Sequence, residues 1–348
     1  KNYREEFIKK IFDALNEKES KNLEEAQKIN ETSKYRCVSL TVESRPDYLN
    51  YEIVDDLLRY GTTRIEIGVQ SVYDDVLEFV KRNHGTKEVK EATKICRDAG
   101  LKITYHIMPN LPNSDLDRDL EMFKILFEDE NYRPDYLKIY PCQIFKNAEL
   151  YELYKEGKFR LYDFEDLVEM LAKALKFIPK YCRIQRLGRD FPLGDFDIGY
   201  KYTNLREFVI KKAKELKIKI NEIREREIGI KMLKGYKPDF ESLHIEKIEY
   251  DANNGKEIFL SFEDKNEVIY AFLRLRIPEK SWRKEIDDKA SIVRELKTFG
   301  FHVPVNSESK FIQHKGLVKA LMQKAEEISL EYGKSKIAVI SAIGTREY

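Results

Sequence analysis

The sequence contains only four cysteines, and no two of them stand close together. They are Cys37, Cys96, Cys142 and Cys182, so there is no Cys-x-x-Cys pair. Zinc knuckles and iron–sulfur clusters are held by closely spaced cysteines, and this spacing predicts no metal site. So few cysteines are typical of a protein kept in a reducing compartment, and we expect a cytoplasmic location.

Long hydrophobic runs and a strong net charge are also missing. No run approaches the ~20 apolar residues of a membrane-spanning helix, and nothing resembles a signal peptide, so we expect no membrane partner. The formal net charge is only +1, so any surface for nucleic acid must be local. The length of 348 residues is sufficient for two domains, each with its own core.

Short β-type runs alternate with helical patterns over the first half of the sequence. Ser39–Glu43 and Arg64–Gln70 flank the helical spacing of Ile53–Tyr60, which indicates a β–α–β unit with parallel strands. The continuing alternation predicts an α/β fold built as a partial β/α barrel, because a closed barrel needs eight strands. The other predicted strands are Lys102–Met108, Tyr136–Pro141 and Arg183–Leu187, and the other predicted helices are Lys1–Asn16, Leu23–Thr32, Thr86–Ala99, Asp115–Glu128 and Phe164–Phe177.

Polar side chains lie where the predicted strands end. They are Glu43, Ser44, Arg45, Gln70, Ser71, His106, Lys138, Tyr140, Arg186 and Arg189. Because the carboxyl ends of parallel strands meet at one edge, we expect a pocket there that holds a polar cofactor. Each residue taken alone also has a structural explanation. Glu43 and Arg45 can form an ion pair, His106 can be a hydrogen-bonded core histidine, and the ammonium of Lys138 can reach solvent.

Five segments of this half resemble the Elongator catalytic subunit family of radical S-adenosylmethionine (SAM) tRNA-modifying enzymes. They are RCVSLTVESRPDY from Arg36, RIEIGVQSVYDDVL from Arg64, ITYHIMP from Ile103, YLKIYP from Tyr136 and RIQRLGRD from Arg183, and they follow the family's order. The resemblance implies a radical-SAM barrel over residues 1–200. It also implies a catalytic role for Lys138 and SAM contacts at Glu43, Arg45, Gln70, Ser71 and His106.

The sequence departs from this family in two places. The family's cysteines for a [4Fe–4S] cluster lie upstream of the matched segments, and no such run is present. We therefore expect an N-terminal segment to be missing, and the cluster to belong to the full-length family member. The family usually has Gly where Asn110 and Asn113 stand. Asn tolerates positive φ better than most residues, so we expect this loop to keep its shape.

Basic residues are concentrated between the two halves, in a predicted connector over residues 201–240. Lys201–Lys237 holds twelve Lys or Arg and five Asp or Glu, a local charge that suits an RNA backbone. We expect RNA contacts at Arg183, Arg186, Arg189, Lys201 and Arg206, with Tyr200 and Tyr202 as stacking partners. The alternative is a solvated helix with many salt bridges, as the alternating charges of Glu222–Glu227 indicate. Some relatives carry cysteines in this connector, but Lys217–Gly229 has none, so we expect no zinc.

From Glu241 the pattern changes to antiparallel strands, a helix and a last strand. Asn253-Asn254-Gly255 is a hairpin turn signal. This order resembles the GNAT acetyltransferase fold, so residues 241–348 are expected to form an α+β acetyltransferase domain. The predicted strands are Ser242–Tyr250, Glu257–Phe262, Glu267–Arg276, Ser291–Phe299 and a buried Lys336–Ile343, and the predicted helix is Ile312–Tyr332.

In the GNAT fold a Gln-x-x-Gly-x-Gly/Ala loop presents backbone N–H groups to the pyrophosphate of acetyl-CoA at a helix N-terminus. The resembling residues are Ile312, Gln313, His314, Lys315, Gly316, Leu317 and Val318. Val318 stands where the pattern has Gly or Ala, so its branched side chain is expected to crowd the diphosphate. The family resemblance also places Tyr348 near the thioester as a catalytic residue. The family continues beyond this point, so we expect a clipped domain.

The resemblance as a whole implies an enzyme that forms the 5-carboxymethyl group of the tRNA wobble uridine from acetyl-CoA, using SAM radical chemistry. The implied partners are tRNA and acetyl-CoA, with a homodimer or an Elongator-like complex as the expected assembly. Two other functions stay open. One is a protein lysine acetyltransferase. The other is a non-catalytic tRNA-binding module, which Val318 and the missing cluster cysteines favour for a truncated sequence.

Overall fold

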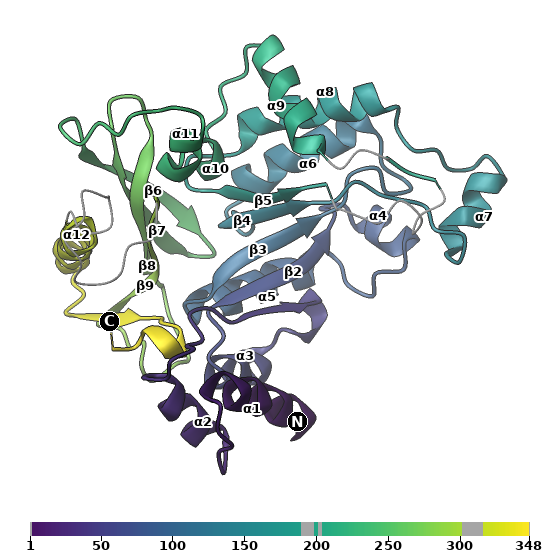
Figure 1. The fold of residues 1–348 in the computed structure, drawn as a ribbon. Helices are drawn as coiled ribbons and strands as arrows, with labels where there is room; N and C mark the ends of the chain where they lie inside the picture. Colours follow the sequence, from purple (N-terminus) through teal and green to yellow (C-terminus); the bar gives the residue numbers. More distant parts are fainter. Residues whose placement is uncertain (1, 189–197, 201–203, 301–315, 348) are drawn as a thin grey trace.

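The structure is built around two five-stranded sheets (Figure 1). This computed structural model describes residues 2–188, 198–200, 204–300 and 316–347. One sheet is parallel and comes from the first half of the chain, and the other is mixed and comes from the second half. The predicted α/β fold class is therefore confirmed. Within the described ranges, none of the helices combines the length and apolar character that crossing a bilayer requires.

The parallel sheet has the five strands that the sequence predicts, paired in sequence order. Two of them, β2 and β5, begin and end at the predicted residues, and the others differ by a few residues at their ends. A run of sequential parallel strands with helices between them forms a barrel that stays open. The strands are β1 (Thr41–Ser44), β2 (Arg64–Gln70), β3 (Lys102–Ile107), β4 (Tyr136–Ile139) and β5 (Arg183–Leu187).

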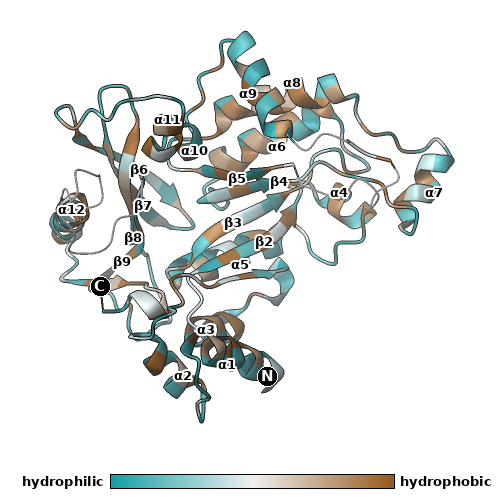
Figure 2. Ribbon diagram, in the orientation of Figure 1, coloured by the Kyte–Doolittle hydropathy of each residue, from teal (hydrophilic) through white to brown (hydrophobic). Residues whose placement is uncertain are grey.

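Amphipathic helices cover the outer side of this sheet, and Figure 2 shows both hydrophobic and hydrophilic turns along them. The Asn50 side chain accepts from Ile53 N–H at 3.0 Å, and the Asp115 side chain accepts from Arg118 N–H at 2.8 Å. These caps begin two of the helices. The elements are α1 (Asn2–Asn16), α2 (Leu23–Asn30), α3 (Tyr51–Arg59), α4 (Asp74–Phe79), α5 (Thr86–Asp98), α6 (Leu116–Glu128), α7 (Glu149–Lys155) and α8 (Phe164–Ala174), with single turns η1 (Pro46–Tyr48) and η2 (Leu175–Phe177).

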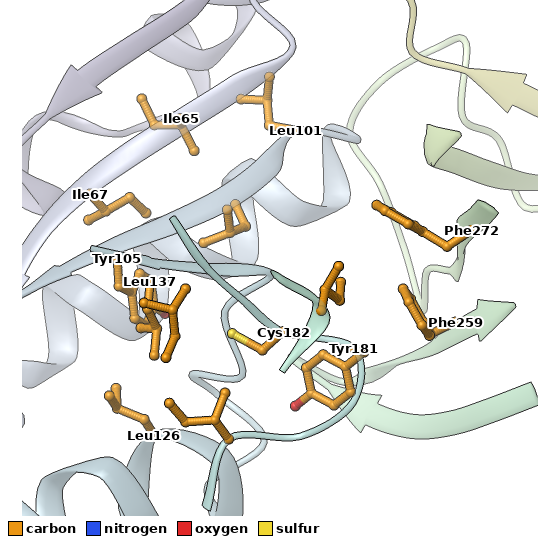
Figure 3. Close-up of a cluster of buried hydrophobic side chains, with 14 of the residues drawn as sticks. Ile65, Ile67, Leu101, Tyr105, Leu126, Leu137, Tyr181, Cys182, Phe259 and Phe272 are labelled. Atoms are coloured by element: carbon orange, nitrogen blue, oxygen red, sulfur yellow. The ribbon is translucent and has the colours of Figure 1, made fainter. Parts of the chain in front are cut away.

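The two faces of the parallel sheet carry different chemistry. Ile65 and Ile67 of β2 point to the outer face, where they are fully buried with Tyr105, Leu137 and the α6 residue Leu126 (Figure 3). Side chains alternate along a strand. The residues between these apolar ones therefore face the inside of the open barrel, and they are polar.

The basic connector folds back onto both sheets. It forms α9 (Leu205–Glu215), α10 (Ile223–Arg226) and α11 (Ile228–Leu233). The alternative given for Glu222–Glu227, a solvated helix with many salt bridges, is right about the salt bridges and wrong about the exposure to solvent. Glu222, Arg226 and Glu227 are all buried, and Arg226 pairs with Glu263 of the second sheet at 2.8 Å. The alternating charges of this stretch therefore form internal ion pairs instead of facing solvent.

The second sheet has the predicted order of elements, with four antiparallel strands, a helix and a last strand parallel to its neighbour. Its spatial order is β10-β9-β8-β7-β6. The last strand is an edge strand and is half-exposed, so the prediction of a buried strand at its position is wrong. The elements are β6 (His244–Ala252), β7 (Gly255–Glu263), β8 (Ile269–Ile277), β9 (Ala290–Thr298), α12 (Leu317–Glu331), β10 (Lys336–Val339) and the single turn η4 (Ile343–Thr345).

The asparagines at the predicted hairpin turn and in the predicted loop adopt positive φ. Asn253 and Asn254 have φ of 47° and 61° in the two-residue turn between β6 and β7, which confirms the predicted hairpin. Asn110 and Asn113 have φ of 64° and 66°. Asn therefore takes the left-handed conformation at the two positions where the family usually has Gly.

The two sheets meet at a seam of buried charges. Arg294 of β9 donates to both carboxylate oxygens of Asp135, at 2.8 and 2.7 Å, and to Glu257 at 2.7 Å. Arg274 of β8 donates to Glu295 at 3.0 Å. Such charges are tolerated in a core only when paired and hydrogen-bonded. Because Asp135 directly precedes β4, the second sheet packs against the amino ends of the parallel strands and leaves their carboxyl ends uncovered.

Candidate active site

Three charged side chains meet on the inner face of the open barrel. Glu66 of β2 bonds His106 Nε2 of β3 at 2.9 Å and accepts a short hydrogen bond from Lys138 Nζ of β4. Glu66 and His106 are buried, and Lys138 is partly buried. Both contacts use the same Glu66 oxygen, Oε2. The carboxylate therefore fixes the ammonium and the imidazole within one hydrogen-bonded group.

The pKa of Glu66 shows how strongly this group holds a negative charge. Burial alone would raise it, but the hydrogen bonds and charges of His106 and Lys138 lower it to about 2. Glu66 is thus an anion at any physiological pH. The strand-end prediction named His106 and Lys138 but missed Glu66, which lies within the predicted strand Arg64–Gln70 and not at its end. A charged residue between Ile65 and Ile67 was the signal that could have found it.

The predicted strand-end residues from β1 and β2 lie at the same edge. Glu43 Oε1 is 3.4 Å from His106 Nδ1, so Glu43 joins the charged group from its exposed side. Arg45 donates from Nε to Asp47 at 3.0 Å, so the ion pair that the sequence suggested involves Asp47 instead of Glu43. Gln70 has φ of 67° and is buried, as is Ser71. The SAM contacts assigned to these residues stay predictions.

A guanidinium that the sequence did not single out lies above β2. Arg82 donates to the Gly68 carbonyl at 3.2 Å, and its Nε has no hydrogen-bond partner within the described residues. A Cβ at Gly68 would stand 2.9 Å from the Gln70 amide nitrogen and 3.0 Å from an Arg82 nitrogen. The absence of a side chain at Gly68 therefore leaves a small space beside Gln70 and Arg82 at the strand ends, which we call the cradle. The Arg82 guanidinium there can bind an anionic group.

The acetyl-CoA loop is only partly within the described residues. Gly316 has φ of 75° and precedes α12, and Leu317 is buried as the first residue of that helix. Val318 is partly buried in the first turn. Its predicted crowding of the diphosphate stays a prediction. Ile312, Gln313, His314 and Lys315 lie outside the described residues, as does Tyr348.

The predicted RNA contacts separate into two groups. Arg183 forms a forked ion pair with Glu227, at 2.9 and 3.1 Å, and Arg206 pairs with Glu222 at 3.0 Å while donating to the Ile184 carbonyl at 2.6 Å. Both guanidinium groups therefore bind partners within the fold. Arg186 is exposed, and in the register of β4 and β5 its Cα lies opposite that of Lys138. Arg189 and Lys201 lie outside the described residues.

Tyr200, predicted as a base-stacking partner, is held by hydrogen bonds to its hydroxyl. Its hydroxyl donates to Asn110 Oδ1 at 3.0 Å and lies 3.1 Å from the Tyr162 carbonyl. It also packs against the hydrophobic core from its partly buried position. These contacts orient the ring, and its predicted role in base stacking stays a prediction. Tyr202 lies outside the described residues.

The cysteines of this chain do not fit an iron–sulfur cluster. All four are buried free thiols, and the described residues contain no group of three cysteines close enough to share a metal. Burial raises the pKa of the Cys142 thiol to about 12, whereas cluster ligands are thiolates. Glu43, Glu66 and His106 do place ligand atoms within 4.8 Å of one another. The Lys138 ammonium already neutralises Glu66 there, so we assign no cation to them.

Comparison with known proteins places this site in a family. Residues 2–123 match the Radical SAM superfamily, and residues 134–215 match the Radical_SAM C-terminal domain. The chain is 45% identical over 99% of its length to proteins named tRNA uridine(34) acetyltransferase from Methanocaldococcus infernus and Methanocaldococcus jannaschii. It is 42% identical to human Elongator complex protein 3. It spans 66%, 65% and 64% of the length of these three relatives.

A solved structure agrees with the sequence comparison. The archaeal Methanocaldococcus infernus Elp3 with an N-terminal deletion superposes with a TM-score of 0.95 at 45% identity, and the match covers 100% of this chain and 83% of that one. At this coverage the likeness extends to both sheets. The chain belongs to the Elp3 family, that of Elongator complex protein 3.

Proposed function

We propose that this chain carries the SAM-binding and acetyl-CoA-binding parts of an enzyme that modifies the wobble uridine of tRNA, forming its 5-carboxymethyl group. The observation that carries the proposal is the buried Glu66–His106–Lys138 group inside an open barrel. It occurs in a chain 45% identical to proteins named tRNA uridine(34) acetyltransferase. Charged groups fixed in a partly buried pocket are characteristic of active sites.

SAM fits the cradle at the strand ends. Its methionyl carboxylate would meet Arg82, whose guanidinium has unused donors, and its amino group would meet the exposed carboxylate of Glu43. Gln70 offers an amide for a ribose hydroxyl, beside the space that Gly68 leaves open. When bound with an iron–sulfur cluster, SAM supplies a carbon radical in this superfamily. The described cysteines offer no cluster site, so we derive no step from it.

Lys138 is the residue that we assign to the substrate. Its ammonium carries three donors, of which one is held by Glu66. Among the described residues the ammonium donates to no other group, so we assign its other two donors to a carbonyl oxygen of the uracil ring that enters the barrel. Glu66 keeps the ammonium in one position, and an oriented donor in a partly buried site acts more strongly than in water. Arg186 in the next strand is exposed and would contact a phosphate of the same RNA.

Acetyl-CoA is assigned to the start of α12. Gly316 and Leu317 turn the chain into a helix of 15 residues, whose free N–H groups favour an anion such as the CoA diphosphate. The homodimer or Elongator-like complex expected above is proposed on the name of the Elongator relatives alone.

The test is tRNA-dependent release of CoA from acetyl-CoA, which requires no radical step. We expect release to rise when transcribed tRNA is added to the protein, and to fall at least tenfold in Lys138→Met, because one charge-assisted hydrogen bond contributes about 1.5–3 kcal/mol. Lys173→Met is the matched control, since Lys173 lies on the outer helix α8 and pairs only with Glu169. Acetylation of a lysine peptide without RNA would overturn the proposal in favour of a protein acetyltransferase.

A second candidate is a tRNA-binding module without catalysis. The observation in its favour is that the four described cysteines provide no cluster site. It predicts that tRNA binds while CoA release stays at the level without RNA. A tRNA titration followed in parallel with the CoA assay separates the two candidates.

A further inference from the structure

A second set of cations lies at the opposite end of the same strands. Arg64 and Lys102 are the first residues of β2 and β3. Arg64 stands two positions before Glu66 on β2, and Lys102 stands four positions before His106 on β3. Since side chains alternate along a strand, Arg64 and Lys102 face the inside of the barrel as Glu66 and His106 do. Arg64 lies over the Tyr136 ring at 4.3 Å from its centre. Across the seam, Lys297 of β9 stands two positions after Glu295, whose carboxylate lies 3.9 Å from Arg64. The Lys297 ammonium lies 5.2 Å from the centre of the Phe299 ring.

The charges in this part of the seam do not balance. Glu295 of β9 lies 3.9 Å from Arg64, but it already accepts from Arg274 at 3.0 Å and from the Tyr136 hydroxyl. The positive charge of Arg274 therefore already neutralises the Glu295 carboxylate, which leaves Arg64 without a counter-charge of its own. Among the described residues, neither Lys102 nor Lys297 has a carboxylate oxygen within 4.0 Å.

The rest of the seam shows that this imbalance is local. Arg274, Arg276 and Arg294 are at most 1% exposed, and each binds at least one carboxylate directly. Arg64 and Lys102 are only partly buried, and Arg64 Nε has no hydrogen-bond partner within the described residues. Unpaired cations in a partly buried place cost folding free energy. Arg274, Arg276 and Arg294 of the seam thus have carboxylate partners. Among the described residues, Lys102 and Lys297 have no carboxylate oxygen within 4.0 Å, and Arg64 has only that of Glu295, at 3.9 Å.

The pKa values of Lys102 and Lys297 are both lowered, as the lack of a close carboxylate would suggest. Burial lowers the pKa of Lys102 to about 8, with Glu295 acting in the opposite direction, and burial also lowers the pKa of Lys297. For both ammonium groups the cost of burial exceeds the effect of the nearby carboxylates, among them Glu295, so their charge is only partly compensated. An oxyanion between them would add to this compensation and would use the free donors of Arg64.

We propose that Arg64, Lys102 and Lys297 form a phosphate-binding site in the seam between the amino ends of β2 and β3 and strand β9. A phosphate group offers several oxygens that can accept from all three side chains, and its negative charge offsets part of theirs. Under the proposed function, on which this assignment of source rests, the phosphate belongs either to the RNA backbone near the modified uridine or to CoA. In both cases the site would hold a substrate group inside the barrel, on the side facing the second sheet.

The first measurement is a thermal unfolding series with inorganic phosphate, against potassium chloride of equal ionic strength. We expect phosphate to raise the Tm of the wild-type protein, because a ligand of the folded state stabilises it. Lys102→Gln and Lys297→Gln should weaken phosphate binding about tenfold or more, the loss of one charge-assisted contact. Lys102→Arg, which keeps the charge, should retain binding. The control Lys87→Gln changes an exposed lysine on α5 and should bind as wild type.

Each result decides the proposal. No phosphate-specific rise in wild type, or an equal loss in Lys87→Gln, overturns it. If Lys102→Gln and Lys297→Gln lower the Tm without phosphate and leave the phosphate-induced rise intact, the lysines are structural and the proposal is wrong.

The source of the phosphate is found with two further probes, a uridine trinucleotide and CoA. Weaker binding of only the trinucleotide by the variants assigns the site to RNA, and weaker binding of only CoA assigns it to CoA; either supports the site. No change with either probe overturns the assignment to substrate. These measurements involve no turnover, so they can succeed when tRNA-dependent CoA release fails, and the two proposals are tested separately.

Discussion

Lys138 on β4 donates to Glu66 on β2, although β3 lies between their two strands. Neighbouring strands stand about 4.8 Å apart, so this contact crosses two strand spacings. Two long side chains can meet there because they reach over the inner face of a curved sheet, with His106 of β3 bound to the same oxygen. The ion pair thus connects three strands on the side where a substrate would enter.

Replacing Glu66 by Gln should destabilise the fold and release Lys138. Removing one partner of a buried ion pair leaves the other uncompensated, and we expect the free energy of unfolding to fall by about 3 kcal/mol. Urea unfolding at pH 7 measures the difference. The control Glu285→Gln removes an exposed partner of Arg283 and should cost less than about 1 kcal/mol.

The same variant has a predicted pH dependence. The pKa of Glu66 is about 2 in the folded protein against 4.5 unfolded. Its contribution to stability is therefore complete above pH 4.5 and is lost as the pH falls towards 2. The difference in stability between wild type and Glu66→Gln should shrink over that range. An equal difference at pH 3 and pH 7 would contradict the charge assignment.

Gly68→Ala should separate ligand binding from folding. The added Cβ would meet the far ends of the Gln70 and Arg82 side chains, at 2.9 and 3.0 Å, and these can move. We expect little change in Tm, but at least tenfold weaker SAM binding by calorimetry, because the cradle is filled. The control Gly229→Ala meets only ordinary contacts, the nearest at 3.6 Å, and should bind SAM as wild type does.

Asp135→Asn should disturb the seam between the two sheets. Asp135 is fully buried and binds Arg294 through both oxygens, and the charges of Arg294 and Arg274 keep its pKa low even though burial acts to raise it. Neutralising it leaves buried guanidinium groups without their counter-charge, and we expect a loss of about 3–5 kcal/mol in chemical unfolding followed by circular dichroism. Asp75→Asn, in an exposed pair with Arg118, should cost less than about 1 kcal/mol. Similar losses in the two variants would contradict a structural role for the seam.

Lys102→Met should change the dependence of stability on pH. Burial lowers the pKa of Lys102 to about 8 from 10.5, while Glu295 and Asp135 raise it and Arg64 and Arg294 lower it. Between pH 8 and 10.5 the unfolded chain binds the extra proton, so wild-type stability rises with pH. In phosphate-free buffer, the stability of Lys102→Met relative to wild type should therefore be highest below pH 8 and decrease towards pH 10.5. A constant difference would show that the ammonium is compensated in the fold.

The sequence by itself determined the order of the elements and the edge of the sheet at which polar side chains gather. Strand β2 and strand β5 have the predicted ends, and the Asn253-Asn254 turn forms as expected. Hydrophobic periodicity and turn chemistry depend on neighbours in the chain, so they can be found without a fold. The polar residues at the strand ends were also visible, because parallel strands bring their carboxyl ends together.

Only the tertiary structure decided which charges are used inside the molecule. Arg183 and Arg206 have the sequence pattern of RNA contacts, but they pair with Glu227 and Glu222. Glu66 gains its role only because β3 and β4 bring His106 and Lys138 to it. Ion pairs between distant segments depend on strand order and on which face each side chain takes, and no local pattern records either.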